Sequence, residues 1–181
     1  MAILLPPPDA NVAQDELMWH LERHLRGLRD GSAFVLVPTG SHAAHVGPIV
    51  CAVDASSDAR RAMRLAGALG AEVDAPLVLA HAVSLAEVDD VGTRALDARA
   101  RLTTRHRVVA NVRRVIGERQ FELLRGGRST QCLLTRFAHD QDARLLIVFG
   151  PSWLSGDVSR AARCPVVVMS PPVGGGPHMP S

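Results

Sequence analysis

The 181-residue sequence contains few aromatic side chains, no tyrosine and no lysine. Aromatic residues make up 3% of the chain and hydrophobic residues 47%, so a core must be built from Val, Leu, Ile and Ala. All 20 basic residues are arginine, which we attribute to the codon bias of a GC-rich genome rather than to function. The formal net charge of +2 is too small to indicate a polyanionic partner.

Long hydrophobic runs are also missing. No apolar run approaches the roughly 18 residues that a membrane-spanning helix needs, and the first residues, MAILLPPPDA, lack the basic segment of a secretory signal. We therefore expect a cytoplasmic protein with no membrane partner. The three cysteines, Cys51, Cys132 and Cys164, form no CxxC pair, so we expect buried free thiols rather than a disulfide or a metal site.

Strand-like and helix-like patterns alternate from residue 48 onwards. Strands are expected at residues 49–53, 77–83, 120–125, 145–149 and 166–169. Helices are expected at residues 57–70, 93–117, 129–139 and 152–162. This alternation predicts an α/β fold with a five-stranded parallel sheet and helices on both faces. Right-handed crossovers favour the strand order 3-2-1-4-5, with a crevice between the first and fourth strands.

The N-terminal part lies outside that alternation. Residues 15–28 have the apolar period of a helix, and residues 33–37 read as a short strand. We therefore expect four parts along the chain. They are a disordered tail (1–13), a helix–strand arm with its linker (14–47), the α/β domain (48–171) and a flexible tail (172–181).

Three segments of the α/β domain resemble the universal stress protein family. The segment IVCAVDASSDARRAMRLAGALGAEVDAPLVLAHAV resembles its opening strand, Asp-[Gly/Ala]-Ser turn, helix and second strand. The segments DARLLIVFG and SRAARCPVVVMS resemble its fourth strand and its last helix and strand. The resemblance covers about residues 48–171, although residues 84–128 match in pattern only. It supports the predicted fold and implies a role in stress responses.

Many members of that family bind ATP through a Gly-x2-Gly-x9-Gly-[Ser/Thr] loop. Gly150 matches the first glycine and Ser152 falls where the last should be, so the resemblance implies that most of the loop is missing. Gly156 is an alternative anchor, but Asp157 beside it would repel phosphate. Asp54 matches the acid that contacts adenine, and Ala82 lies near the second adenine contact. The other interpretation of Asp54 is a cap for the helix at residue 57, which we favour.

These residues predict a regulatory or interaction module that does not bind ATP strongly, needs no cofactor and is not an enzyme. The alternative is an adenine-nucleotide (ATP or AMP) binding protein that uses Asp54, Ala82, Gly150 and Ser152. No catalytic set is recognisable, because Ser56 and Ser57 have no nearby base and His81 reads as a core residue.

The arm suggests a partner for the sheet edge. Its order of helix, strand and proline mirrors the end of the chain, as if residues 14–38 were the remnant of a preceding tandem copy. In this family, last strands pair edge to edge between copies or subunits. We therefore expect strand 33–37 to cover strand 166–169, within the chain or in a homodimer formed through either strand.

Two polar clusters invite other readings. Glu16, His20 and His24 share one helical face, and His42 and His45 follow in the linker; a solvated face is favoured over a metal site. The expected helix at 93–117 is rich in arginine but lacks interleaved aromatics, so no nucleic-acid partner is expected. A sensor that binds an anion or a metal through these Arg or His residues is a third hypothesis.

Overall fold

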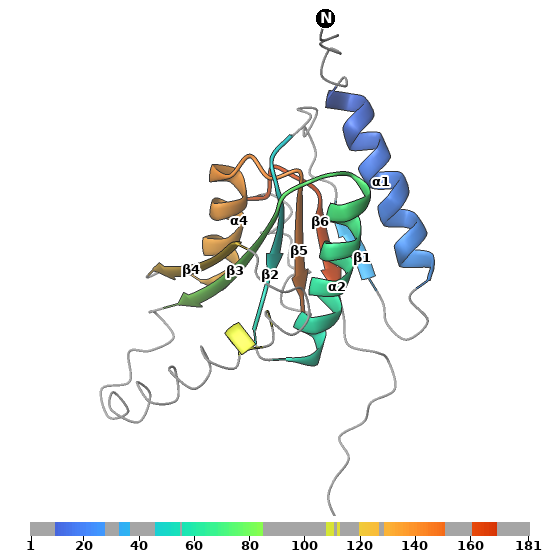
Figure 1. The fold of residues 1–181 in the computed structure, drawn as a ribbon. Helices are drawn as coiled ribbons and strands as arrows, with labels where there is room; N and C mark the ends of the chain where they lie inside the picture. Colours follow the sequence, from blue (N-terminus) through green and yellow to red (C-terminus); the bar gives the residue numbers. More distant parts are fainter. Residues whose placement is uncertain are drawn as a thin grey trace, which may run out of the picture.

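The computed structural model describes residues 10–27, 33–36, 46–54, 56–84, 108–110, 112, 120–126, 129–150 and 161–169. They form one six-stranded sheet with helices against it (Figure 1). The strands are β1 (Ala33–Leu36), β2 (Ile49–Ala52), β3 (Leu77–Ser84), β4 (Gln120–Gly126), β5 (Leu145–Phe149) and β6 (Val166–Met169). The helices are α1 (Ala10–Arg26), α2 (Ser57–Glu72) and α4 (Thr130–Asp140). Within these ranges, no helix is both long and apolar enough to cross a bilayer.

The strand order is β1-β6-β5-β2-β3-β4. The five strands from β2 onwards are parallel to their neighbours, and their order is the one that the sequence predicts. The sixth strand is β1 of the arm, which joins the sheet antiparallel to β6. The α/β fold is therefore confirmed, with the arm strand as a member of the sheet.

Alternate residues of the central strands point to opposite faces of the sheet. On one face, Ile49, Ile147 and Val167 share an apolar cluster with residues of α1 and α2. On the other face, Val50, Leu146 and Val168 pack with residues of α4. Both faces of β2, β5 and β6 are thus buried, which explains why these strands read as continuous apolar runs.

Helix α1 begins earlier than the sequence pattern indicates. It starts at Ala10, so the last four residues of the segment expected to be disordered, 10–13, are helical. The apolar period begins only at Leu17, and for this reason it misses the first two turns. Asp9, which immediately precedes the helix in sequence, is of a residue type favoured at helix N-caps. The expected helices at 93–117 and 152–162 lie mostly outside the described residues, which include helical Val108–Ala110, Val112 and Ala161.

The arm covers both an edge and a face of the sheet. Strand β1 pairs with β6 in the register Ala33↔Met169 to Leu36↔Val166. Leu17 and Leu21 of α1 are fully buried in the cluster that also contains Val167 and Met169. The expected covering of strand 166–169 therefore occurs within the chain. Because β6 has β5 on one side and β1 on the other, a dimer through the β6 edge would require β1 to leave.

Close contacts fix the point where the chain enters the domain. A Cβ atom on Gly47 would lie 2.3 Å from the carbonyl oxygen of Asp142, so only glycine fits there. The backbone N–H of Gly47 donates to that oxygen at 3.2 Å. Arg144 Nε donates to the carbonyl oxygen of Gly47 at 2.9 Å. The segment before β2 is thus held against the turn before β5.

Deletion of residues 1–40 is expected to lower solubility or to change the oligomeric state. The deletion removes α1 and β1, and it leaves an apolar edge strand and an apolar sheet surface open to other chains. Size-exclusion chromatography with light scattering and thermal melting would measure both effects. An unchanged elution volume together with an unchanged melting temperature would contradict the role of the arm.

Leu21→Ala is expected to lower the free energy of unfolding by about 2–5 kcal/mol, because it opens a cavity between α1 and the sheet. Urea denaturation followed by circular dichroism would measure the change. Glu22→Ala is the matched control, since Glu22 is exposed and forms an ion pair with Arg26 of the same helix. A Leu21→Ala effect no larger than that of the control would show that α1 does not stabilise the domain.

Candidate functional site

Three of the four predicted site residues lie at one level of the sheet. Ala52 of β2 is opposite Ala80 of β3, and Cys51 is opposite Ile147 of β5. Continued past the end of β2, these parallel registers bring Asp54 to the level of Ala82 and Gly150, near the carboxyl ends of the strands. This edge is where parallel α/β sheets hold ligands. Ser152 lies outside the described residues.

Asp54 braces the turn between β2 and α2. Its Oδ1 accepts the backbone N–H of Ser56 at 2.6 Å, an arrangement in which an Asp side chain mimics a backbone turn. Ser56 in turn is the N-cap of α2, and its Oγ accepts the backbone N–H of Ala59 at 3.1 Å. The expectation that Asp54 caps the helix is therefore corrected, because Ser56 is the cap and Asp54 holds the cap in place.

His81 is a residue of this edge that sequence reasoning assigned to the core. Its Nδ1 lies 2.7 Å from the carbonyl oxygen of Val53, and the ring is only partly buried. A carbonyl oxygen can only accept, so Nδ1 carries the proton and Nε2 is the acceptor of the neutral ring. The missed signal is strand length. β3 has eight residues and β2 four, so residues of β3 beyond Ala80 extend past their neighbour.

Gly150 follows β5 with a backbone conformation that favours glycine. Its φ is 96°, and its N–H donates to the carbonyl oxygen of Met169 at 2.9 Å. A Cβ atom added to Gly150 would meet none of the described atoms within 4 Å. The backbone angle, rather than crowding, thus requires glycine here.

The polar groups of this edge are therefore engaged in holding turns. The carboxylate of Asp54 accepts one backbone N–H, and the Nδ1–H of His81 donates to the carbonyl of Val53. Ser56 Oγ accepts from the helix rather than facing a base. In the described part of this edge, no hydrogen bond joins a nucleophile to a general base, the pairing that covalent catalysis uses.

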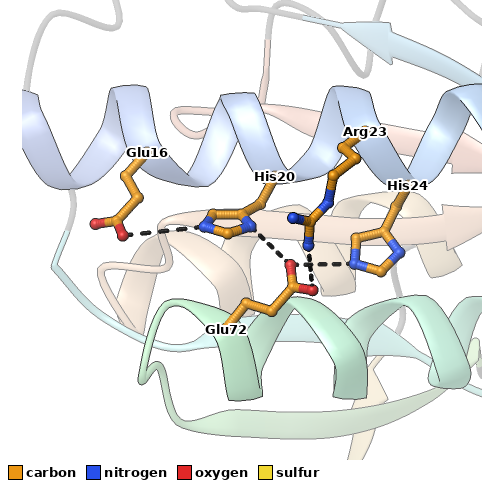
Figure 2. Close-up of polar contacts among 5 residues, drawn as sticks. All are labelled: Glu16, His20, Arg23, His24 and Glu72. Atoms are coloured by element: carbon orange, nitrogen blue, oxygen red, sulfur yellow. Dashed lines mark hydrogen bonds and ion pairs between the residues drawn. The ribbon is translucent and has the colours of Figure 1, made fainter.

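A second polar cluster joins α1 to α2 (Figure 2). The carboxylate of Glu72 on α2 contacts His20, Arg23 and His24 of α1, with His20 Nδ1 at 2.8 Å and His24 Nε2 at 3.1 Å from Oε2. Burial alone would raise the pKa of Glu72, but the hydrogen bond from His24 and the positive charges of His24, Arg23 and His20 lower it below its ordinary value.

This cluster corrects the view of the histidine face as purely solvated, since the side chain of His20 is only 15% exposed. Glu72 is distant in sequence, so the spacing of the α1 residues gave no sign of it. Across the described residues, no group of three or more His, Cys, Asp or Glu side chains is placed to hold a metal ion. His42, His45 and the arginines of segment 93–119 lie outside the described residues.

Two of the three cysteines are buried in the sheet region. Burial raises the pKa of the Cys51 thiol well above its usual range and that of Cys164 to about 12. Both therefore stay protonated near neutral pH and are poor nucleophiles. Cys132 on α4 is only partly buried, in contrast to the expectation for all three.

The sequence matches no protein-family model and no curated protein. Several solved structures are similar to it, among them the three that follow. A protein of the universal stress protein family from Burkholderia pseudomallei has 25% identity and a TM-score of 0.53, covering 70% of this chain and 97% of that one. The universal stress protein from Archaeoglobus fulgidus in complex with dAMP has 24% identity and a TM-score of 0.50, covering 69% and 98%. A functionally unknown protein from Pseudomonas aeruginosa has 17% identity and a TM-score of 0.54, covering 92% and 57%.

The likeness of these structures to this chain identifies its architecture. The chain has the fold of the universal stress proteins.

Proposed function

We propose that this chain is a non-catalytic module of the universal stress protein type that regulates or binds a partner and does not hold ATP strongly. The observation that carries the proposal is the shortage of chain after β5. In ATP-binding members of the family, a glycine-rich loop separates the glycines that Gly150 and Ser152 match. In this chain, Pro151 is the one residue between these two positions. Backbone N–H groups of such a loop neutralise the phosphates, so a chain without it loses most of its grip on a triphosphate.

The engagement of the crevice residues supports the same proposal. Asp54 Oδ1 already accepts the N–H of Ser56, and His81 is bonded to the carbonyl of Val53. Neither group is poised as an acid or a base against a nucleophile. The module therefore acts by binding, without a cofactor, and the family likeness of its domain favours a role in stress responses.

A smaller adenine ligand is the second candidate. The strand registers bring Asp54, Ala82 and Gly150 to one level of the sheet, and a similar structure was solved in complex with dAMP; both observations support this candidate. A monophosphate has less charge to neutralise than a triphosphate, so it depends less on the missing loop. This candidate predicts that AMP and dAMP bind while ATP does not.

We also propose that the module forms a homodimer through the edge strand β1. The free side of β1 is a sheet edge, and its sequence, Ala-Phe-Val-Leu, carries no charge that would discourage pairing with a second copy. This interface leaves the contact between β1 and β6 intact.

A thermal-shift series with ATP, ADP, AMP, dAMP and cAMP tests the proposal. A ligand at 100 times its dissociation constant stabilises by about 2.7 kcal/mol, which in a protein of this size raises the melting temperature by several degrees. Millimolar ATP is expected to leave the melting temperature unchanged. A shift with ATP would overturn the proposal, whereas a shift confined to AMP or dAMP would establish the second candidate.

A pair of substitutions at Asp54 separates the two roles of its carboxylate. Asp54→Ala is expected to lower the free energy of unfolding by about 1 kcal/mol, because the turn before α2 loses its brace. Asp54→Asn keeps an acceptor oxygen and is expected to retain most of that stability. Denaturation of both variants measures this, and equal losses would show that the brace contributes nothing. If AMP binds, its weakening by Asp54→Asn would identify an adenine contact.

A further inference from the structure

His20 lies between two carboxylates. Its Nδ1 is 2.8 Å from Oε2 of Glu72 on α2, and its Nε2 is 3.9 Å from Oε1 of Glu16, one turn earlier on α1 (Figure 2). Although Nδ1 is buried and close to Glu72, the atoms are not aligned for a hydrogen bond, and Nδ1 has no hydrogen-bond partner among the described residues. The contact is therefore held by charge.

The protonation state of His20 decides whether both contacts are attractive. A neutral imidazole has one N–H and one lone pair, whereas an imidazolium has an N–H on each nitrogen. In the neutral ring, one lone pair must face a carboxylate oxygen, and the two negative regions repel. Only the imidazolium is attracted by both Glu16 and Glu72.

The charges around His20 come from two helices. On α1 they are Glu16, Arg23 and His24, and on α2 the facing group is Glu72. Strands β1 and β6, which share the apolar cluster with α1, have no ionisable side chain. Asp74 in the turn after α2 is exposed, and Asp58 and Arg61 at the other end of α2 pair with each other. Among the described residues, Glu72 is thus the charged group of another element that contacts α1.

We propose that His20, together with Glu72 and Glu16, forms a proton-sensitive latch that holds the N-terminal arm on the domain. Protonation of His20 tightens α1 against α2. Loss of that proton as the pH rises turns one of the two contacts from attractive to repulsive and loosens the arm. A loosened arm gives other chains access to the β6 edge that β1 covers. This device stands independently of the proposed binding function.

The latch weakens at both ends of the pH scale. The pKa of Glu72 is lowered in the folded chain. Glu72 therefore stabilises the docking of α1 fully above the pKa that it has in the unfolded chain, and this stabilisation is lost as the pH falls through the lowered pKa. The contribution of an imidazolium is present at low pH and is lost as the pH rises through the range in which histidines deprotonate. The arm is therefore held most firmly in mildly acidic solution.

Hydrogen–deuterium exchange of the α1 amides in the full-length chain tests the latch. Protection factors, corrected for the intrinsic pH dependence of exchange, are compared at about pH 6 and about pH 8. In the unaltered chain, protection of α1 is expected to be about threefold higher at the lower pH, the size of effect typical of a half-exposed ion pair. Protection of α4, which makes no contact with the latch, is expected to stay the same.

Glu72→Gln is expected to abolish the pH-dependent step in α1 protection. His20→Gln and Glu16→Gln are each expected to reduce it, because His24 still contacts Glu72 in both variants. His139→Gln is the matched control, since His139 is an exposed histidine on α4, and it is expected to leave the step unchanged. Protection of α1 that does not vary between the two pH values, or a step of full size in His20→Gln, would overturn the latch.

The fluorescence of Trp19 provides a second readout that does not depend on exchange. The Trp19 and His20 rings meet edge to face with centroids 4.8 Å apart. In a Trp153→Phe background, Trp19 is the one tryptophan of the chain. Its emission is expected to change over the pH range in which α1 protection changes, and the change is expected to vanish in His20→Gln. An identical emission profile in His20→Gln would contradict the role of His20.

Discussion

Strand β6 requires cover on two faces and on two edges, and the rest of the fold is arranged around that requirement. All four of its residues are buried, and none carries a polar side chain. Strand β5 covers one edge, and the two faces belong to the two apolar clusters of the molecule. The remaining edge is covered by a segment more than a hundred residues away in sequence. The N-terminal arm is therefore part of the folded unit rather than an appendage to it.

At the carboxyl ends of the strands, where parallel α/β sheets hold ligands, polar groups of this chain form hydrogen bonds that stabilise turns and strand ends. Asp54, His81 and Gly150 lie toward this edge of the sheet, and each makes a backbone hydrogen bond that fixes a turn or a strand end. A polar group already paired with the backbone gains less from a new partner than a free one does.

Much of the architecture could be predicted from the sequence, because strands buried on both faces must be continuous apolar runs. The bounds of β5 and β6 are correct for that reason. The pairing of Glu72 with the α1 histidines could not be predicted, since it depends on how two distant helices pack. The exposure of His81 and the cap at Ser56 were missed because each depends on where a neighbouring strand ends, which periodicity determines only to within a residue or two.

The arm is joined to the domain by a linker, and the linker is anchored at Gly47. All of the contacts that the arm makes with β6 and α2 are available in identical form on every other copy of the chain. Exchange of arms between two copies would therefore preserve each of those contacts while linking the copies into a domain-swapped pair. The share of swapped pairs would then rise with protein concentration, because β6 can be covered by the arm of a neighbouring copy as well as by the arm of its own chain.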